Sequence, residues 1–323
     1  MTEHRPGRRV LLHLTRLMGY GVLFCLLVTT VLLLLAPTLE LDLELGSMVL
    51  RSQRGVTVDL AGAPAGWRGP PLAPPATPAD GPARSVILLI GDGMGVGPVS
   101  VASLLEPGRR GPLALEGAGA VALMRTHAAD ALDTDSAAAG TAMATGHKTL
   151  RRTVGVDRHG VPRRTLLDVA AEAGLATGVV TTSYLADATP ATFTAHAASR
   201  GMKADILAQM LAGGVDLLVG GDSGVPEGEL EEILAGSPRP VVRSAGGLGR
   251  ATLPLAALLP ARPGRASAHG PPLAATTRRA LELLAEDPKG FVLVAECEES
   301  DSAGHANDLH HMLESVAELD AAV

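Results

Sequence analysis

Short apolar runs that alternate with helical stretches constrain the fold of this chain more than any other feature. Five such runs have the length and aliphatic content of buried strands. They cover residues 86–90, 177–182, 215–219, 240–243 and 291–295. Helices are predicted at residues 136–145, 165–173, 202–211, 227–235 and 273–285. This alternation predicts an α/β fold with a mostly parallel central sheet flanked by helices.

Four acidic residues follow the predicted strands closely. Asp92 comes after the first strand, Asp187 after the second, and Glu296 and Asp301 after the last. Ligands of open α/β sheets gather at the carboxyl ends of the strands, so these side chains are expected to share one crevice. Because neighbouring carboxylates repel one another unless cations or protons neutralise them, we expect divalent metal ions there.

A serine stands at the predicted start of a helix of small residues. The run DTDSAAAGTAMATG covers residues 133–146 and places Ser136 at the helix N-terminus. Unpaired N–H groups and the helix dipole stabilise an anion at that end, whether a phosphoryl group or a serine alkoxide. Arg200, thirteen residues after Asp187, can hold two phosphate oxygens at once. Metals, Ser136 and Arg200 together predict a site for phosphoryl transfer.

Each motif also has a purely structural interpretation. Serine and aspartate are common helix caps, which would explain Ser136, Asp92 and Asp187 without any chemistry. Asp301 and His305 are spaced to share one helix face, but a single pair of this kind often arises by chance. The combination of all the segments, rather than any one of them, favours a catalytic site.

Four separated blocks resemble the alkaline phosphatase family, in its form with two zinc ions, one magnesium ion and a serine nucleophile. The blocks lie in the family's order between residues 84 and 323. They are IGDGMG at 90–95, TDSAA at 134–138, DATP at 187–190 with Ser199 and Arg200, and Glu296 with Asp301 and His305. The resemblance is weakest over residues 220–272, which are rich in glycine and proline and are predicted to form surface loops. A sulfatase is not favoured, because the chain has no Cys-x-Pro-x-Arg motif.

The resemblance implies how the chain would hydrolyse a phosphate monoester. Ser136 would be the nucleophile that becomes phosphoserine, and it would also contact zinc. Arg200 would hold the phosphate, and Asp135 would help to orient the Arg200 guanidinium. Asp187 would act near the magnesium ion through a water molecule. The family mechanism consists of two in-line displacements, the second of them by water.

The resemblance also implies the metal ligands. Asp92 would bridge the magnesium ion and one zinc ion, and Thr189 and Glu296 would complete the protein ligands of the magnesium. Asp301 and His305 would bind the other zinc ion. The family has three further zinc ligands nearer its C-terminus, an Asp-His pair and a later His. The sequence ends before they occur, so we expect it to be part of a longer protein.

Three features lie close to the last block. Residues 308–323 are predicted to form an amphipathic helix, because their apolar side chains recur at spacings of three and four. Ser302 stands where family members often have Lys, His or Trp, which is expected to affect phosphate release and metal preference. Cys297 follows Glu296, where a glycine would be usual.

The N-terminal segment predicts a membrane anchor. Residues 17–36 are a stretch of twenty residues without a charge, which is long enough to cross a bilayer as a helix. Arginines precede it and acidic residues follow it, so residues 1–16 are expected in the cytoplasm and the rest in the periplasm or outside the cell. A cleaved signal peptide is the alternative. Residues 37–83 are predicted to hold a small strand pair and then a Pro/Gly-rich linker, which leads to a catalytic domain over 84–323.

Composition argues against several classes of function and partner. The net charge is −7 and the exported part has no basic patch, so nucleic-acid binding is not expected. Aromatic residues make up 2% of the chain, which favours recognition of phosphate itself over stacking on a base or sugar. Cys25 lies in the predicted membrane span and Cys297 beside the predicted site, so no disulfide is expected. Dimers are common in the resembled family, and a homodimer is therefore among the expected assemblies.

The sequence thus predicts a membrane-anchored, metal-dependent phosphate monoesterase, with two alternatives left open. A phosphodiesterase or phosphonate hydrolase of the same superfamily would also use a hydroxyl nucleophile and two metals. A non-catalytic module that binds phosphate or metal would fit the missing zinc ligands. Rates on a monoester and a diester separate the first pair, and phosphate binding without turnover would identify the third.

Overall fold

The computed structural model describes residues 43–45, 48–50, 83–105, 112–117, 120–222, 224–263 and 265–323. The chain divides into two units, Met1–Gly62 and Ala63–Val323. In the first unit, β1 (Leu43–Leu45) pairs antiparallel with β2 (Met48–Leu50), which confirms the strand pair predicted in this region. The predicted membrane span, 17–36, lies outside the described residues. Among the helices that are described, none has the length and apolar character needed to cross a membrane.

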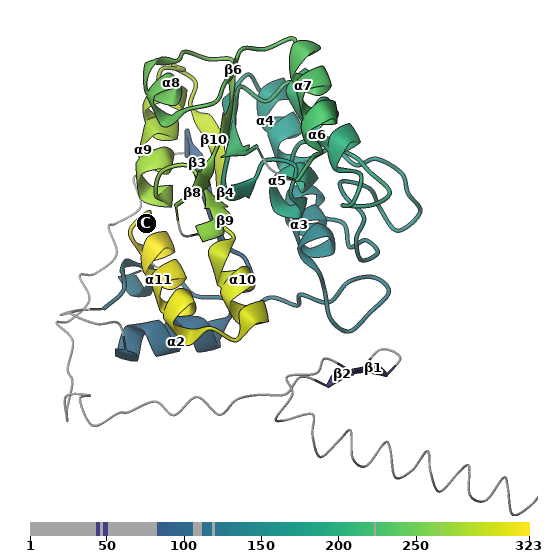
Figure 1. Cartoon of the computed structure of the whole chain (residues 1–323), viewed down its shortest axis with the longest axis vertical. Helices are drawn as coiled ribbons and strands as arrows, with labels where there is room; N and C mark the ends of the chain where they lie inside the picture. The colour runs from purple at the N-terminus through teal and green to yellow at the C-terminus, as the bar shows by residue number, and fades with distance from the viewer. Residues whose placement is uncertain are drawn as a thin grey trace, which may run out of the picture. The chain divides into compact units, whose positions relative to one another are not determined.

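A six-stranded sheet forms the centre of the second unit (Figure 1). Its strands lie in the order β3-β10-β4-β5-β7-β6, and every pairing is parallel. The strands are β3 (Val86–Gly91), β4 (Ala176–Tyr184), β5 (Leu217–Gly221), β6 (Val241–Val242), β7 (Leu255–Leu259) and β10 (Phe291–Cys297). The predicted α/β fold with a mostly parallel sheet is therefore confirmed. Because β10 lies between β3 and β4, the three strands that precede the predicted acidic residues are neighbours.

Helices cover both faces of this sheet (Figure 1). One face carries α3 (Ser136–Thr145), α4 (Leu166–Glu172), α5 (Ala188–Thr192), α6 (Lys203–Ala212) and α7 (Glu227–Ala235). The other face carries α8 (Ala245–Arg250), α9 (Leu273–Leu284) and α11 (Leu309–Asp320). Successive strand residues point to opposite faces, so Val179 packs in the first core and Val180 in the second. Each strand therefore needs apolar residues throughout, which is why these strands read as unbroken apolar runs.

The remaining elements lie around the sheet. Helix α2 (Val96–Leu105) packs against α11, with Ala102, Leu113, Leu313 and Val316 buried between them. Helix α10 (Glu299–Ala306) follows β10, and a short 3₁₀-helix covers Ala114–Gly117. Strands β8 (Ala261–Arg262) and β9 (Arg265–His269) form an antiparallel pair. The amphipathic helix predicted over 308–323 is present as α11.

The prediction that residues 220–272 form surface loops is wrong. This region contains β7, whose five residues are all buried between β5 and β6. Its sequence is Leu-Ala-Ala-Leu-Leu, and leucine and alanine are not strong strand formers. Prolines 254 and 260 flank the strand directly. The run therefore resembled a loop, whereas burial on both faces of the sheet makes it a strand.

Candidate active site

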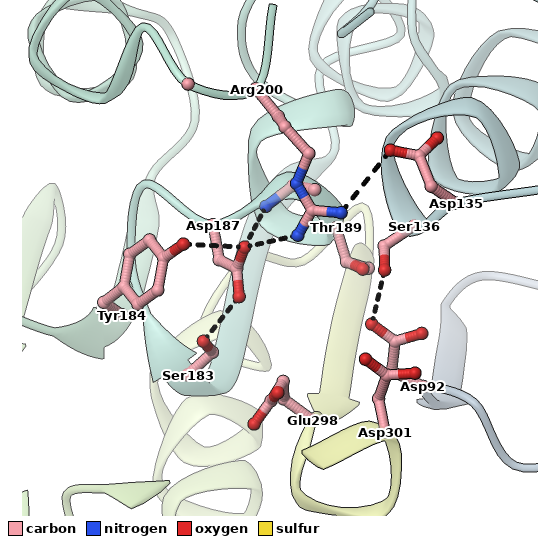
Figure 2. A network of polar contacts seen from close by, with 12 residues as sticks. Asp92, Asp135, Ser136, Ser183, Tyr184, Asp187, Thr189, Arg200, Glu298 and Asp301 are labelled. Carbon is pink, nitrogen blue, oxygen red and sulfur yellow. Dashed lines mark hydrogen bonds and ion pairs between the residues drawn. The ribbon is translucent and has the colours of Figure 1, made fainter. Parts of the chain in front are cut away.

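The carboxyl ends of β3, β10 and β4 bring the predicted acidic residues together. Glu296 lies on β10 opposite Ile90 of β3 and Thr181 of β4. The backbone N–H of Asp92 donates to the carbonyl of Cys297 at 3.0 Å, which extends the pairing beyond the strand end. The hydroxyl of Ser300 donates to the carbonyl of Asp92 at 2.6 Å. The acidic side chains expected to share one crevice therefore lie near enough to one another to interact electrostatically, and Figure 2 shows Asp92, Asp187 and Asp301 among them. We refer to the region that they share as the crevice.

Ser136 is the first residue of α3, and its hydroxyl points into the crevice (Figure 2). Its Oγ donates to Oδ2 of Asp92 at 2.9 Å. Asp135 is the N-cap residue of the helix, and its carboxylate accepts from the N–H of Ala138 at 3.0 Å. Asp135 thus satisfies an N-terminal N–H group, while Ser136 keeps its hydroxyl for the crevice.

The small residues after Ser136 allow α3 to approach α5 closely. A Cβ atom added at Gly140 would lie 2.5 Å from the hydroxyl oxygen of Thr192 on α5, which is too close for any side chain. Ala137 and Ala138, in the first turn of α3, are also buried. This packing holds the start of α3 next to α5, the helix that carries Thr189. The small-residue run therefore positions the serine as well as forming its helix.

Arg200 lies between two carboxylates at the edge of the crevice (Figure 2). Its Nη2 donates to Oδ1 of Asp187 at 3.0 Å, and its Nη1 lies 3.5 Å from Oδ2 of Asp135. Burial lowers the pKa of this guanidinium and the two aspartates raise it, with a net increase, so Arg200 stays charged. The backbone of Arg152 joins the same group, since its N–H donates to the Asp135 carboxylate and its carbonyl accepts from the N–H of Arg200.

Asp187 and Thr189 flank the start of α5. The Asp187 carboxylate caps this helix by accepting from the N–H of Ala188 at 2.7 Å. Thr189 is buried, and its hydroxyl is near enough to the Glu296 carboxylate to lower the pKa of that group. Thr181 donates to Oε2 of the same carboxylate at 2.6 Å. Glu296 also lies close enough to Asp92, the hydrogen-bond partner of Ser136, for the charges of the two carboxylates to repel each other.

Burial and mutual repulsion make it unfavourable for the carboxyl groups of the crevice to ionise. Burial and the charge of Asp301 raise the pKa of Asp92 to about 6. Burial, Asp92 and Asp187 raise the pKa of Glu296 well above its ordinary value. Burial also raises the pKa of Glu298 to about 7. A divalent cation would remove this cost, because it favours the ionised form of every carboxylate near it.

Asp301 and His305 lie on one face of α10, as their spacing predicted. His305 Nε2 is 3.3 Å from Asp301 Oδ2, and the His305 side chain is 66% exposed. Gly93 makes room for Asp301, because a Cβ atom there would lie 2.7 Å from its Oδ1. Asp301 therefore sits beside the loop that carries Asp92, while His305 reaches toward solvent.

The donor atoms fit the metals that the family would hold. Two carboxylates and a hydroxyl, from Asp92, Glu296 and Thr189, are the oxygen donors that magnesium prefers. A carboxylate and an imidazole, from Asp301 and His305, suit zinc. Within the part of the chain that the structure describes, no group of three or more His, Cys, Asp and Glu side chains is arranged to hold a metal ion. The magnesium set contains only two such side chains, Asp92 and Glu296, and the zinc set contains only Asp301 and His305. Neither set therefore reaches three.

Three polar residues of the crevice were not predicted from the sequence. Ser183 and Tyr184 donate to the Asp187 carboxylate at 2.7 and 3.1 Å. Glu298 accepts from Ser302 through Oε1 at 2.8 Å, while its Oε2 is buried with no hydrogen-bond partner among the described residues. The positions of Ser183 and Tyr184 at the end of a buried strand were the only available signal. Nothing in the sequence distinguished Glu298 from its neighbour Glu299.

Comparison with known proteins supports the same family. The family model described as alkaline phosphatase matches residues 83–221 and 257–323. Alkaline phosphatase of Escherichia fergusonii is 32% identical over 313 residues, covering 76% of this chain and 66% of the relative. Streptomycin-6-phosphate phosphatase of Streptomyces griseus is 44% identical over 165 residues, covering 48% of this chain and 36% of the relative.

Solved structures are similar over about three quarters of the chain. A cold-active alkaline phosphatase from Shewanella has a TM-score of 0.64 and 27% identity, and the match covers 74% of this chain and 62% of that one. Alkaline phosphatase from the Antarctic bacterium TAB5 has a TM-score of 0.65 and 26% identity, and the match covers 74% and 72%. The chain spans about two thirds, or less, of the first curated relatives it matches. By its matched family model and its fold, this chain belongs to the alkaline phosphatase family.

Proposed function

We propose that this protein hydrolyses phosphate monoesters through a phosphoserine formed on Ser136. The observation that carries the proposal is the position of the Ser136 hydroxyl. It lies at the N-terminus of α3, 2.9 Å from the Asp92 carboxylate and beside a guanidinium fixed by two aspartates. The hydroxyl, the helix N–H groups and the cation converge on the place where a phosphoryl group would lie.

The reaction would proceed in two displacements. The Ser136 hydroxyl gives up its proton to water as its oxygen attacks phosphorus and forms the new bond. The bond to the ester oxygen breaks, and that oxygen takes a proton from water to leave as the alcohol. Arg200 donates to the phosphoryl oxygens in both steps and so lowers the cost of their charge. A water molecule then attacks phosphorus, which releases inorganic phosphate and restores the serine. Asp92, Thr189 and Glu296 would hold magnesium, and Asp301 and His305 would hold zinc. When bound, these cations supply positive charge that favours the serine alkoxide.

Replacing the nucleophile tests the proposal directly. Ser136→Ala is expected to lose phosphoenzyme formation and at least about a thousandfold of turnover, since the covalent route is removed. The measurement is acid trapping of labelled phosphoenzyme, together with metal content and thermal unfolding. Ser100→Ala, at an exposed position on α2, is the matched control and is expected to behave as the unmodified protein. Normal phosphoenzyme formation by Ser136→Ala would refute the assignment.

The two alternatives make different predictions in the same assay. Faster turnover of a diester or phosphonate than of a monoester would favour the related hydrolases. Stoichiometric binding of phosphate with no turnover at any zinc or magnesium concentration would favour a binding module. The observation in favour of a monoesterase is the family match, since the matched relatives are named alkaline phosphatase and streptomycin-6-phosphate phosphatase.

We also propose that residues 17–36 anchor the protein in the cell membrane, with the catalytic unit exported to the periplasm or cell surface. The support is the uncharged stretch itself and the arginines that precede it. Membrane fractionation and protease accessibility of the intact protein test this arrangement. Recovery of a shortened soluble product would favour a cleaved signal peptide instead. A homodimer stays a prediction from the family resemblance.

A further inference from the structure

The Asp187 carboxylate accepts more hydrogen bonds than a helix cap requires. Four groups donate to it: Ser183 Oγ at 2.7 Å, the N–H of Ala188 at 2.7 Å, Arg200 Nη2 at 3.0 Å and Tyr184 Oη at 3.1 Å. Ser183 binds Oδ2, and the other three bind Oδ1. Because donors hold both oxygens, the plane of the carboxylate is fixed. Figure 2 shows the two hydroxyls and the guanidinium meeting at this carboxylate.

Asp187 is the main anchor of the Arg200 guanidinium. Its contact with Arg200 is a normal charge-assisted hydrogen bond of 3.0 Å, whereas the contact with Asp135 is 3.5 Å. The Asp187 side chain is also the less exposed of the two, at 12% against 23%. The direction in which the guanidinium faces the crevice therefore depends mainly on the orientation of Asp187.

Tyr184 is built to donate a hydrogen bond rather than to carry charge. It is the last residue of β4, and Lys203 Nζ lies 4.3 Å from the centre of its ring, which favours one ring position. Burial, together with the charge of Asp187, raises the pKa of the Tyr184 hydroxyl well above its ordinary value. The hydroxyl therefore keeps its proton and presents it to Asp187.

We propose that Tyr184, assisted by Ser183, is a positioning residue for phosphate binding, which acts through Asp187 to hold Arg200 in the orientation that receives phosphate. The inference rests on the proposed function, because it concerns the same crevice. Neither hydroxyl needs to touch the substrate. Their contribution is to fix, before phosphate arrives, a guanidinium that would otherwise lose side-chain freedom on binding.

Loss of the Tyr184 hydroxyl is expected to lower the affinity for phosphate in two ways. Asp187 would be less firmly oriented, so Arg200 would be less well placed for phosphate oxygens. Asp187 would also lose a neutral donor, so it would compete more strongly with phosphate for the guanidinium. Both effects weaken phosphate binding, while the residues proposed to hold metal are unchanged.

The test uses the full chain with zinc and magnesium bound, and inorganic phosphate as the probe. Tyr184→Phe removes only the hydroxyl and keeps the ring beside Lys203. We expect the dissociation constant for phosphate, measured by calorimetry, to rise roughly three- to tenfold, with unchanged metal content. Ser183→Ala is expected to act in the same direction and provides the test if the tyrosine variant fails to fold. Thr194→Val is the control, since this nearby hydroxyl donates to the carbonyl of Pro190 and has no contact with Asp187.

A double-mutant cycle separates positioning from a general structural effect. In an Asp187→Asn background, Tyr184→Phe is expected to change phosphate affinity less than twofold, because its route to Arg200 is already impaired. An equal loss in both backgrounds would overturn the inference, as would unchanged phosphate affinity in Tyr184→Phe and Ser183→Ala. If the unmodified protein turns over monoesters and the variants bind phosphate normally, only the inference fails. If the unmodified protein neither binds phosphate nor turns over, the proposed function fails and the inference falls with it.

Discussion

Glu298 places one more carboxylate in a crevice that is already rich in them. Its Oε2 is buried with no hydrogen-bond partner among the described residues, and burial raises its pKa to about 7. Such an oxygen is costly to keep ionised unless a cation or an ordered water faces it. At the scale of single residues, Glu298 therefore adds a negative charge that the protein itself balances poorly.

Replacing Glu298 with glutamine removes the negative charge and keeps the size of the side chain, so it tests the effect of the charge alone. We expect Glu298→Gln to weaken magnesium binding roughly three- to tenfold, because one negative charge near the cation is removed. In the presence of a chelator the same variant should unfold at a temperature a few degrees higher, because the repulsion is relieved. Calorimetric titration with magnesium and thermal unfolding measure the two effects. Glu282→Gln, an exposed position on α9, is the control, and equal behaviour of the two variants would contradict the prediction.

The acidic residues also predict how pH affects the metal-free protein. The pKa of Asp92 is about 6 in the folded state against an ordinary 3.8, and that of Glu298 is about 7 against 4.5. A carboxyl whose folded pKa is raised binds more protons when folded, so its contribution to stability is full below the unfolded pKa. That contribution is lost as pH rises through the folded pKa. In chelator, the unfolding temperature should therefore fall between about pH 4 and pH 7.

Asp92→Asn is the variant that checks this pH dependence. It should flatten the fall in unfolding temperature between pH 4 and pH 7, because one of the titrating groups is gone. Added magnesium should also flatten it in the unmodified protein, since the cation replaces the protons. Scanning calorimetry at several pH values measures both effects. A slope that neither Asp92→Asn nor magnesium changes would show that other groups control the response.

At the scale of elements, Arg239 secures the end of α6. Its guanidinium is buried and donates to the carbonyls of Leu211, Gly213 and Val215. The last carbonyls of a helix have no partner within the helix, and here one side chain satisfies that end and the loop into β5. The arginine stands just before β6, far from α6 in sequence, so the two segments are tied together.

Removing that guanidinium should destabilise the fold without touching the crevice. Arg239→Met keeps much of the apolar side chain but leaves three carbonyls without their donor, which should cost about 2 to 4 kcal/mol. Arg243→Met, a neighbouring arginine with exposed ion pairs to Asp222 and Glu231, should cost about 1 kcal/mol or less. Urea unfolding of both variants measures the difference. Similar losses in the two would show that burial of the guanidinium is not the cause.

The elements that the sequence predicted well were those with a strong local signal. Helix α3 matches its prediction residue for residue, because Asp135 caps one end and Gly146, with φ of 73°, closes the other. Strands β3 and β10 were recognised from their aliphatic runs. Strand β7 was not, because its strand conformation depends on burial between β5 and β6 rather than on its own residues.

At the scale of the whole molecule, the site was predictable where a motif carried it and not where packing created it. Ser136, Asp92 and Glu296 lie in recognisable blocks, and the sheet order brings those blocks together. Ser183 and Tyr184 belong to the site only because β4 ends where α5 begins and directs both hydroxyls at Asp187. Contacts of this kind depend on three-dimensional placement, and no local pattern in the sequence records them.

The position of β10 between β3 and β4 has a consequence for how the protein is assembled. Strands β3 and β4 come early in the chain, yet β10 separates them and supplies Glu296 between them. During synthesis, Ser136 and Arg200 are therefore made well before β10, and the crevice cannot form until β10 has been added. Pairings between segments so distant in sequence form slowly. Metal binding would then occur only after folding is complete, because a chain in which β10 has not yet joined the sheet offers a cation no enclosed site.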